Sequence, residues 1–262
     1  MAANEVLTER RGQSLILTFN RPGSANALTI DMANQLFTIL KNTTTDKSVR
    51  AVLLCGAGSN FMNGLDMNFY AGNVSDALDS ANQLILPYHS AIRELQVMDK
   101  PVLCAVEGHV TGTGFSLMLA SDLVIAGKSA RFNTRFAEYA LTPDGGCSYF
   151  LPRKVGLSRA VEIMMLCEEF NAERAERLRI VNKVVEDEDL QDEALVWLDK
   201  LAAGPTKAYG AIKKLACRSY EQDLNAHLGL EHTYFGQSSR SFDFREAVRA
   251  HKAGNETKFT GT

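Results

Sequence analysis

The sequence lacks the cysteine patterns that mark a disulfide framework or a metal site. Its 262 residues include five cysteines, an odd number, which form no C-x-x-C pair and no cysteine–histidine spacing suited to zinc. Most of them lie inside apolar runs, where a cysteine behaves as a small hydrophobic residue. The sequence therefore predicts reduced core cysteines, no metal ion and a cytoplasmic protein.

The sequence also lacks long apolar runs and a large net charge. No run approaches the length needed to cross a bilayer, and residues 1–12 contain no apolar core of a signal peptide. The 28 basic and 31 acidic side chains leave a formal charge of -3, which creates no strong field over the surface. We therefore expect neither a membrane nor a nucleic acid among the partners, and any anionic ligand must be held by local groups.

Three familiar nucleotide-binding or catalytic motifs are absent. Gly112-Thr113-Gly114 lacks the third glycine of a dinucleotide fingerprint, because Leu117 stands at that position. No Gly-Lys-Ser/Thr sequence marks a phosphate-binding loop. Ser116 follows the glycine turn, but the second glycine of a nucleophile elbow is missing.

What the sequence does contain is a glycine turn between a buried strand and a buried helix. Apolar residues 102–106 predict the strand, Gly108, Gly112 and Gly114 follow, and residues 115–120 predict a short helix. The first N–H groups of such a helix have no partner within it. They can bind an anion, or an oxyanion that exists only during a reaction. A plain packing turn is the competing interpretation.

A second glycine turn could supply the second donor that an oxyanion needs. Residues 51–55 predict a buried strand, and the turn after it contains Gly64 and Leu65. The N–H group of Leu65 could therefore join that of Thr113. A simple loop reversal at Gly64 is the alternative.

A single carboxylate stands out in the next glycine-rich stretch. Asp144 lies between Pro143 and Gly145 in an otherwise apolar setting. A buried carboxylate can act as an acid or a base. The competing interpretation is that Asp144 caps a helix that begins there.

Hydrophobic spacing along the chain predicts a mixed α/β fold. Strands are expected at residues 6–9, 14–19, 51–55, 102–106, 123–126, 130–133 and 182–185. Helices are expected after a cap at Thr29 and at residues 76–98, 115–120, 156–166, 171–177, 190–203, 205–217 and 220–239. This order predicts a core domain over residues 1–200 and a helical region over residues 201–262.

Several blocks in a fixed order resemble one known family. They are Arg21-Pro22 with Asn26-Ala27-Leu28, the run from Phe61 to Met67, the turn from Gly108 to Gly114 with Ser121-Asp122, Pro143-Asp144-Gly145-Gly146 with Leu151-Pro152-Arg153 and Gly156, and the run from Phe242 to Val248. Together they resemble the crotonase superfamily, also called the enoyl-CoA hydratase/isomerase family. The resemblance implies an α/β spiral of β-β-α units with a helical C-terminal region. It also implies acyl-CoA thioester substrates, with coenzyme A as part of the substrate and no separate cofactor.

The resemblance also implies a set of site residues. The oxyanion hole falls on the N–H groups of Leu65 and Thr113. Residues 25–28 and 66–68 would lie along the CoA arm. The expected substrate-binding residues are Ala25, Ala27, Leu28, Asn63, Gly64, Asp66, Met67, Asn68, Gly112, Phe136 and Leu141.

Two departures from the family pattern shape the functional hypothesis. Hydratases of the family use two glutamates, and their positions are Ser116 and Phe136 here. Neither side chain can activate water, which argues against efficient hydration. One carboxylate, Asp144, suits a proton shuttle from C2 to C4, so we expect an enoyl-CoA isomerase that converts 3-enoyl to 2-enoyl thioesters in fatty acid metabolism. Hydration with Glu138 or another group as acid and base is the alternative.

Two further alternatives remain open. Family dehalogenases place a nucleophilic aspartate at the position of Asp144 and a histidine on the helix that here carries His89, but their tryptophan is replaced by Phe136, and the only tryptophan is Trp197. From another class, the chain could bind acyl-CoA without catalysis.

The helical region predicts self-association. Helices 190–203 and 220–239 carry apolar residues that need a partner surface, among them Leu195, Leu198, Leu201, Leu224, Leu228, Tyr234 and Phe235. Closed symmetric assembly would cover them. The resemblance implies a homotrimer or a dimer of trimers, with Lys252 or Lys258 near the CoA phosphates of a neighbour.

Overall fold

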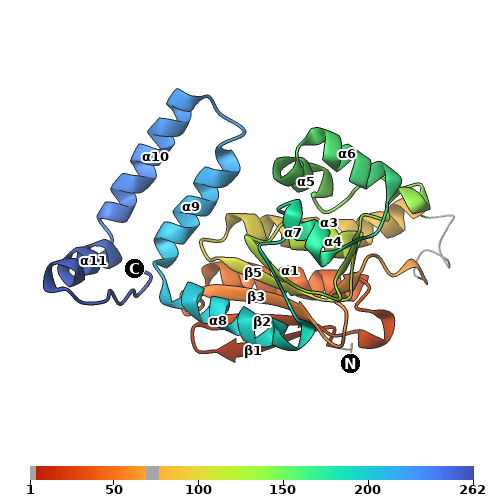
Figure 1. The fold of residues 1–262 in the computed structure, drawn as a ribbon, viewed down its shortest axis with the longest axis horizontal. Helices are drawn as coiled ribbons and strands as arrows, with labels where there is room; N and C mark the ends of the chain where they lie inside the picture. The colour runs from red at the N-terminus through yellow and green to blue at the C-terminus, as the bar shows by residue number, and fades with distance from the viewer. Residues whose placement is uncertain (1–3, 69–76) are drawn as a thin grey trace.

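A computed structural model describes residues 4–68 and 77–262 of the chain (Figure 1). Its strands are β1 Val6–Arg11, β2 Ser14–Phe19, β3 Ala51–Gly56, β4 Met62–Asn63, β5 Val102–Val106, β6 His109–Thr111, β7 Leu123–Gly127, β8 Arg131–Asn133, β9 Phe170–Asn171 and β10 Lys183–Val185. Its helices are α1 Ile30–Thr45, α3 Ala77–Val97, α4 Thr113–Leu119, α5 Cys147–Val155, α6 Leu157–Leu166, α7 Ala172–Arg177, α8 Leu190–Ala203, α9 Thr206–Arg218, α10 Leu224–Ser239 and α11 Phe242–Ala253. Asp76, the expected first residue of the long helix, lies outside the described residues.

The strands form two sheets that the chain visits in turn. The larger sheet has the order β1-β2-β3-β5-β7-β10, and the smaller one has the order β4-β6-β8-β9. In the three pairs β3–β4, β5–β6 and β7–β8, the first strand lies in the large sheet and the second in the small sheet. A helical segment follows each pair. The expected α/β spiral of β-β-α units is therefore confirmed.

The central strands bury both faces, which explains their unbroken apolar runs. In β3, Val52 and Leu54 face the core on one side, while Ala51 and Leu53 face the core on the other. Helices α1 and α3 pack on the first side, and α8 packs on the second. Period-two alternation along a strand thus sorts the side chains between two helical layers.

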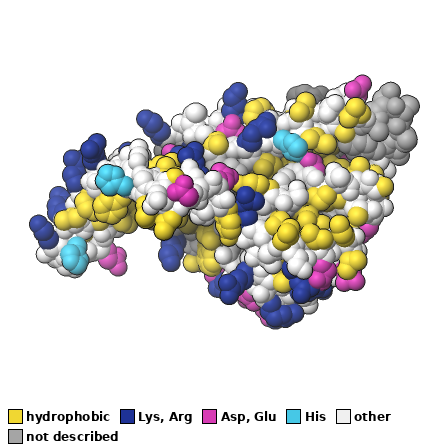
Figure 2. Space-filling model, turned by 90° about the horizontal axis from the view of Figure 1, so that it is seen from above, with side chains coloured by type: hydrophobic (Ala, Val, Ile, Leu, Met, Phe, Trp, Pro, Cys, Tyr) yellow, Lys and Arg dark blue, Asp and Glu magenta, His cyan; other side chains and the backbone are white. Residues whose placement is uncertain are grey.

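The helices after α8 project away from the sheets as an arm (Figure 1). The apolar residues expected to need a partner divide into two groups. Those of α8 are covered by the chain's own large sheet, where Leu198 is fully buried. Those of α10 are not, because Leu224 is 71% exposed and Phe235 is 74% exposed. Hydrophobic side chains also gather along this arm in Figure 2.

The last residues of the chain fasten the arm to the core. Arg50, a buried residue next to β3, donates hydrogen bonds to the carbonyl groups of Gly204 and Phe259. The buried Asp243 carboxylate of α11 accepts hydrogen bonds from the N–H groups of Thr260 and Gly261, at 2.7 and 2.8 Å. These contacts hold residues 259–261 between the core and α11. The core-packed helix α8 ends at residue 203, so the expected boundary at residue 200 falls inside it.

The structure differs from one local expectation and excludes one competing interpretation. The glycine turn after β5 contains a short strand, β6, whose three residues are too few to show a periodic pattern. Asp144 does not cap a helix: α5 begins only at Cys147, and Gly146 at its start provides no side-chain cap. The cap at Thr29 is confirmed, because its hydroxyl oxygen accepts a hydrogen bond from the N–H of Met32 at 3.0 Å.

Candidate active site

Three neighbouring strands of the small sheet end at one edge. β4, β6 and β8 are parallel, with Asn63 opposite Thr111 and Thr111 opposite Asn133. Parallel strands present their carboxyl ends together, so the residues that follow them lie side by side. Those residues are Gly64-Leu65, Gly112-Thr113 and Thr134-Arg135. The segments after β4 and β6 are so close that a Cβ atom at Gly112 would lie 3.3 Å from the Cα atom of Gly64.

A cavity of about 510 Å³ opens at this edge. The residues expected to contact substrate that line it are Ala25, Ala27, Asn63, Gly64, Leu65, Asp66, Met67, Asn68, Gly112, Thr113, Phe136 and Leu141. Further lining residues, not expected from the sequence, are Gly23, Ser24, Thr111, Thr134, Arg135 and Tyr139. Thr111, Thr134 and Arg135 lie at or just after the ends of β6 and β8. The signal for them is that these strands run parallel in one sheet.

Leu28 and Asp144 are not among the lining residues. Leu28 is fully buried, and its backbone pairs with the segment that carries Leu65. Its N–H group donates to the Gly64 carbonyl, and its carbonyl accepts from the N–H of Asp66. Leu28 therefore fixes the position of Leu65 from behind the cavity wall.

The amide groups of Leu65 and Thr113 are free of backbone acceptors within residues 4–68 and 77–262. Leu65 lies between the two residues that bond to Leu28, so its own N–H group points to the other side of the ladder. Thr113 is the first residue of α4, where an N–H group has no partner inside the helix. Both residues line the same cavity.

A buried tyrosine holds the first turn of α4. The Tyr88 hydroxyl of α3 donates a hydrogen bond to the Thr113 carbonyl at 2.6 Å. Burial raises the pKa of Tyr88 well above its ordinary value, and the nearby Asp144 raises it further. Tyr88 is therefore a permanent donor at neutral pH.

Asp144 lies beside the same end of α4. The Ser116 hydroxyl donates to the Asp144 carbonyl at 2.7 Å, which ties the segment before α5 to α4. The Oδ1 atom of Asp144 is hydrogen-bonded to Nε2 of His89, one residue after Tyr88 on α3. The Oδ2 atom of Asp144 is buried and has no hydrogen-bond partner in the described part of the chain. His89 is the partner that local sequence patterns could not assign, because 55 residues separate it from Asp144.

Cys147 is the thiol closest in sequence to Asp144. It is fully buried at the start of α5. Burial raises its pKa to about 12, although a hydrogen bond with Ser116 opposes the shift. Cys147 therefore stays protonated and has no nucleophilic role at neutral pH. All five cysteines are free thiols, as expected.

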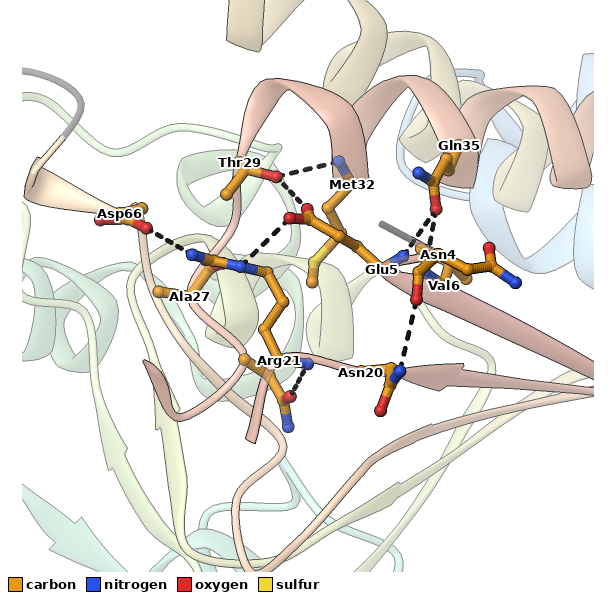
Figure 3. A network of polar contacts seen from close by, with 11 residues as sticks. Asn4, Glu5, Val6, Asn20, Arg21, Ala27, Thr29, Met32, Gln35 and Asp66 are labelled. Atoms are coloured by element: carbon orange, nitrogen blue, oxygen red, sulfur yellow. Dashed lines mark hydrogen bonds and ion pairs between the residues drawn. The ribbon is translucent and has the colours of Figure 1, made fainter. Parts of the chain in front are cut away.

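A polar network anchors the wall of the cavity that residues 23–27 and 66–68 form (Figure 3). The Arg21 guanidinium pairs with Asp66 at 2.9 Å and with Glu5 at 3.2 Å. It also donates to the Ala27 carbonyl at 2.7 Å. Glu5 in turn accepts a hydrogen bond from the Thr29 hydroxyl at the start of α1. One arginine thus joins both segments that the family resemblance places along the CoA arm.

A second arginine organises another part of the cavity wall. Arg135 pairs with Glu138 at 3.1 Å and contacts Asn63 and Tyr139. Glu138 also accepts a hydrogen bond from the Asn133 amide at 3.1 Å. Its carboxylate is thus occupied by two neighbours, and Glu138 does not line the cavity. This arrangement weakens the case for Glu138 as a hydratase acid or base.

Two other kinds of site were sought in residues 4–68 and 77–262. No helix there is long and apolar enough to cross a membrane. No group of three or more histidine, cysteine, aspartate or glutamate side chains there could hold a metal ion.

Comparison with known sequences decides the family. The sequence model described as enoyl-CoA hydratase/isomerase matches residues 10–262. The chain belongs to this family. The crotonase resemblance is thereby confirmed, and this member of the enoyl-CoA hydratase/isomerase family is an enzyme by that membership.

Individual relatives within the enoyl-CoA hydratase/isomerase family carry different activities. The chain is 36% identical to the 1,2-epoxyphenylacetyl-CoA isomerase of Escherichia coli (strain K12), over 94% of this chain and 95% of that protein. It is 29% identical to the short-chain-enoyl-CoA hydratase of Clostridium acetobutylicum, over 95% of each chain. The crystal structure of an enoyl-CoA hydratase from Polaromonas sp. JS666 superposes with a TM-score of 0.92 at 30% identity, covering 97% of this chain and 99% of that one.

Proposed function

We propose that this enzyme is an enoyl-CoA isomerase that converts 3-enoyl-CoA to 2-enoyl-CoA. The observation that carries the proposal is the buried Oδ2 atom of Asp144, which has no hydrogen-bond partner among the described residues. A buried carboxylate oxygen without a partner requires an explanation, because nearly all such atoms are hydrogen-bonded. A role in taking up a substrate proton supplies one, since such an oxygen must stay without a protein partner.

The reaction needs two kinds of group. The Asp144 carboxylate removes a proton from C2 of the 3-enoyl thioester, and the electrons move onto the thioester oxygen as an enolate conjugated with the double bond. The N–H groups of Leu65 and Thr113 stabilise that oxyanion. Protonated Asp144 then returns the proton to C4, which re-forms the thioester carbonyl and leaves the double bond between C2 and C3. The carboxylate ends as it began, and no separate cofactor is needed.

The absence of the two glutamates favours isomerisation over hydration. The hydroxyl of Ser116, at one of the two positions, is engaged with the Asp144 carbonyl. Phe136, at the other, is an apolar residue of the cavity wall. Neither can activate water, whereas a shuttle between two carbons of one substrate needs a single carboxylate.

The test is an assay of purified enzyme with a 3-enoyl-CoA. We expect Asp144→Asn to lower kcat by roughly 10²- to 10⁴-fold, the usual contribution of general acid–base catalysis, with a small change in KM. Asp199→Asn removes a surface carboxylate that pairs with Arg11 and should leave kcat unchanged. Isomerisation at the same rate after the Asp144 exchange would remove Asp144 from the mechanism. No turnover of any 3-enoyl-CoA by the wild type would refute the isomerase assignment.

One observation favours a second candidate function. The contact between His89 and Asp144 is the pair that a dehalogenase-like hydrolysis requires. There the Asp144 carboxylate would displace a halide from an aryl-CoA to form an aryl ester, and His89 would take a proton from the water that hydrolyses it. Phe136 stands in place of the family tryptophan, and Trp197 of α8 is hydrogen-bonded to Glu193 instead. An Asp144-linked ester detected by mass spectrometry would favour this candidate over the isomerase.

A further inference from the structure

Arg135 is a cation in the wall of the cavity. It holds the same position after β8 that Leu65 and Thr113 hold after β4 and β6, two residues past the paired row of Asn63, Thr111 and Asn133. Its backbone has a φ of +54°, in the left-handed region that costs an arginine conformational energy. Glycine or asparagine would adopt this backbone conformation at a lower energy than arginine does.

The guanidinium is held in a fixed orientation without being saturated. Its Nε atom donates to Glu138 at 3.1 Å, Nη1 donates to Asn63 at 3.3 Å, and Nη2 donates to the Tyr139 hydroxyl at 3.2 Å. A guanidinium has five N–H donors. Within the described residues, two donors are thus left for a ligand in the cavity. Asp66, the other charged lining residue, is paired with Arg21, as Arg135 is paired with Glu138 through Nε.

We propose that Arg135 binds a carboxylate at the far end of the acyl group, so that the preferred substrates are thioesters of dicarboxylic acids. The inference rests on the proposed acyl-CoA site. A planar, pre-oriented guanidinium matches a carboxylate and forms charge-assisted hydrogen bonds with it. The apolar side chains of Phe136 and Leu141 in the same cavity suit the hydrocarbon between the thioester and the carboxylate.

The CoA phosphates are a poor alternative source of the anion. Arg135 is one strand away from Thr113, whose N–H group is assigned to the thioester oxygen. The pantetheine arm separates the thioester from the phosphates by many bonds, whereas an acyl carboxylate lies only a few carbons away. Residues 23–27 and 66–68, a different part of the cavity wall, are assigned to CoA.

The test compares two saturated thioesters of equal length, hexanoyl-CoA and adipoyl-CoA, by equilibrium binding at constant ionic strength. We expect the enzyme to bind adipoyl-CoA tighter by about tenfold or more, as hydrogen bonds to a charged group allow. Arg135→Gly and Arg135→Asn both fit a positive φ, so neither should disturb the fold. Each should abolish the preference. Arg131→Gln, in β8 itself and outside the cavity, should retain the preference.

Equal affinities in the wild type would overturn the proposal, as would a preference that survives both Arg135 variants. If the Arg135 variants bind both thioesters more weakly to the same degree, the guanidinium contacts CoA, and the proposal is also rejected. Neither compound contains a double bond, so the measurement does not depend on isomerase turnover. Failure of the isomerase assignment appears instead as absent turnover of 3-enoyl thioesters.

Discussion

Tyr88 is the residue through which α3 bonds to the first turn of α4. Its ring is buried, and its hydroxyl is bonded to the carbonyl of Thr113, the residue whose N–H group we assign to the thioester oxygen. The next residue, His89, contacts Asp144. One turn of α3 therefore sets both the proposed donor and the proposed base.

We expect Tyr88→Phe to lower kcat by about tenfold with little change in KM, because a misplaced donor weakens mainly the transition state. The lost hydrogen bond should also lower the free energy of unfolding by about 1 kcal/mol. Steady-state kinetics and urea unfolding measure the two effects. Tyr149→Phe is the matched control, since its hydroxyl bonds to Glu221 at the surface. A drop in the free energy of unfolding without a change in kcat would show that Tyr88 has only a structural role.

Single residues were predictable where a local pattern or the family pattern marks them. Glycine turns located Leu65 and Thr113, and the apolar setting drew attention to Asp144. Arg135 was not expected at the site, and His89 was named only through the family dehalogenases, because the partners of both residues come from other elements. The contact of His89 with Asp144 and that of Arg135 with Asn63 both depend on the tertiary fold. The spacing of residues within one helix or strand does not reveal contacts between different elements.

At the scale of elements, the seating of α4 against β4 depends on the absence of a side chain at Gly114. A Cβ atom at this position would lie 2.4 Å from the Met62 carbonyl oxygen. No flexible side chain can yield there, because the obstacle is backbone. The first turn of α4 can therefore approach β4 only with glycine.

Gly114→Ala should destabilise the fold by about 1–3 kcal/mol, the usual cost of overpacking, despite the better helix propensity of alanine. Gly229→Ala in α10 provides the control, because a Cβ atom there would meet nothing within 4 Å. That exchange should stabilise the protein by up to about 1 kcal/mol. Thermal and urea unfolding of both variants measure the contrast. Equal stabilisation of both would show that α4 is not tightly seated.

Elements with strong periodicity were predicted close to their observed bounds. Helix α8 was expected at residues 190–203 and is found there. Strands β4, β6 and β9 were not expected, since two or three residues cannot display a period. These short strands exist because the small sheet pairs them, and two of them, β4 and β6, carry the candidate site together with β8.

For the whole molecule, the exposed apolar face of α10 predicts self-association. Large exposed apolar patches mark interaction sites, and this one lies on an arm that leaves the core. We expect light scattering at micromolar concentration to give three or six times the 28.8 kDa of one chain. Phe235→Glu should lower that mass, whereas Val196→Glu on the outer side of α8 should not. A fully active species of 28.8 kDa would refute both the assembly and a shared site that uses Lys252 or Lys258.

The assignment of residues 201–262 to assembly was drawn from sequence, and it stays a prediction. What the sequence could not show is how the arm is fixed. The hydrogen bonds from Arg50 to the carbonyl groups of Gly204 and Phe259 join positions more than 150 residues apart. Hydrogen bonds between such distant positions depend on the tertiary fold rather than on local sequence propensity.

The row formed by Leu65, Thr113 and Arg135 has an evolutionary consequence. Each of the three comes from a different turn of the spiral, and the pairing of β4, β6 and β8 keeps the turns in register whatever side chains follow them. The first two are proposed to act through backbone N–H groups, which only an exchange to proline would remove. The third acts through its side chain. If the proposed roles hold, mutation after β8 can redirect the enzyme to new acyl groups, while the proposed oxyanion donors are inherited unchanged.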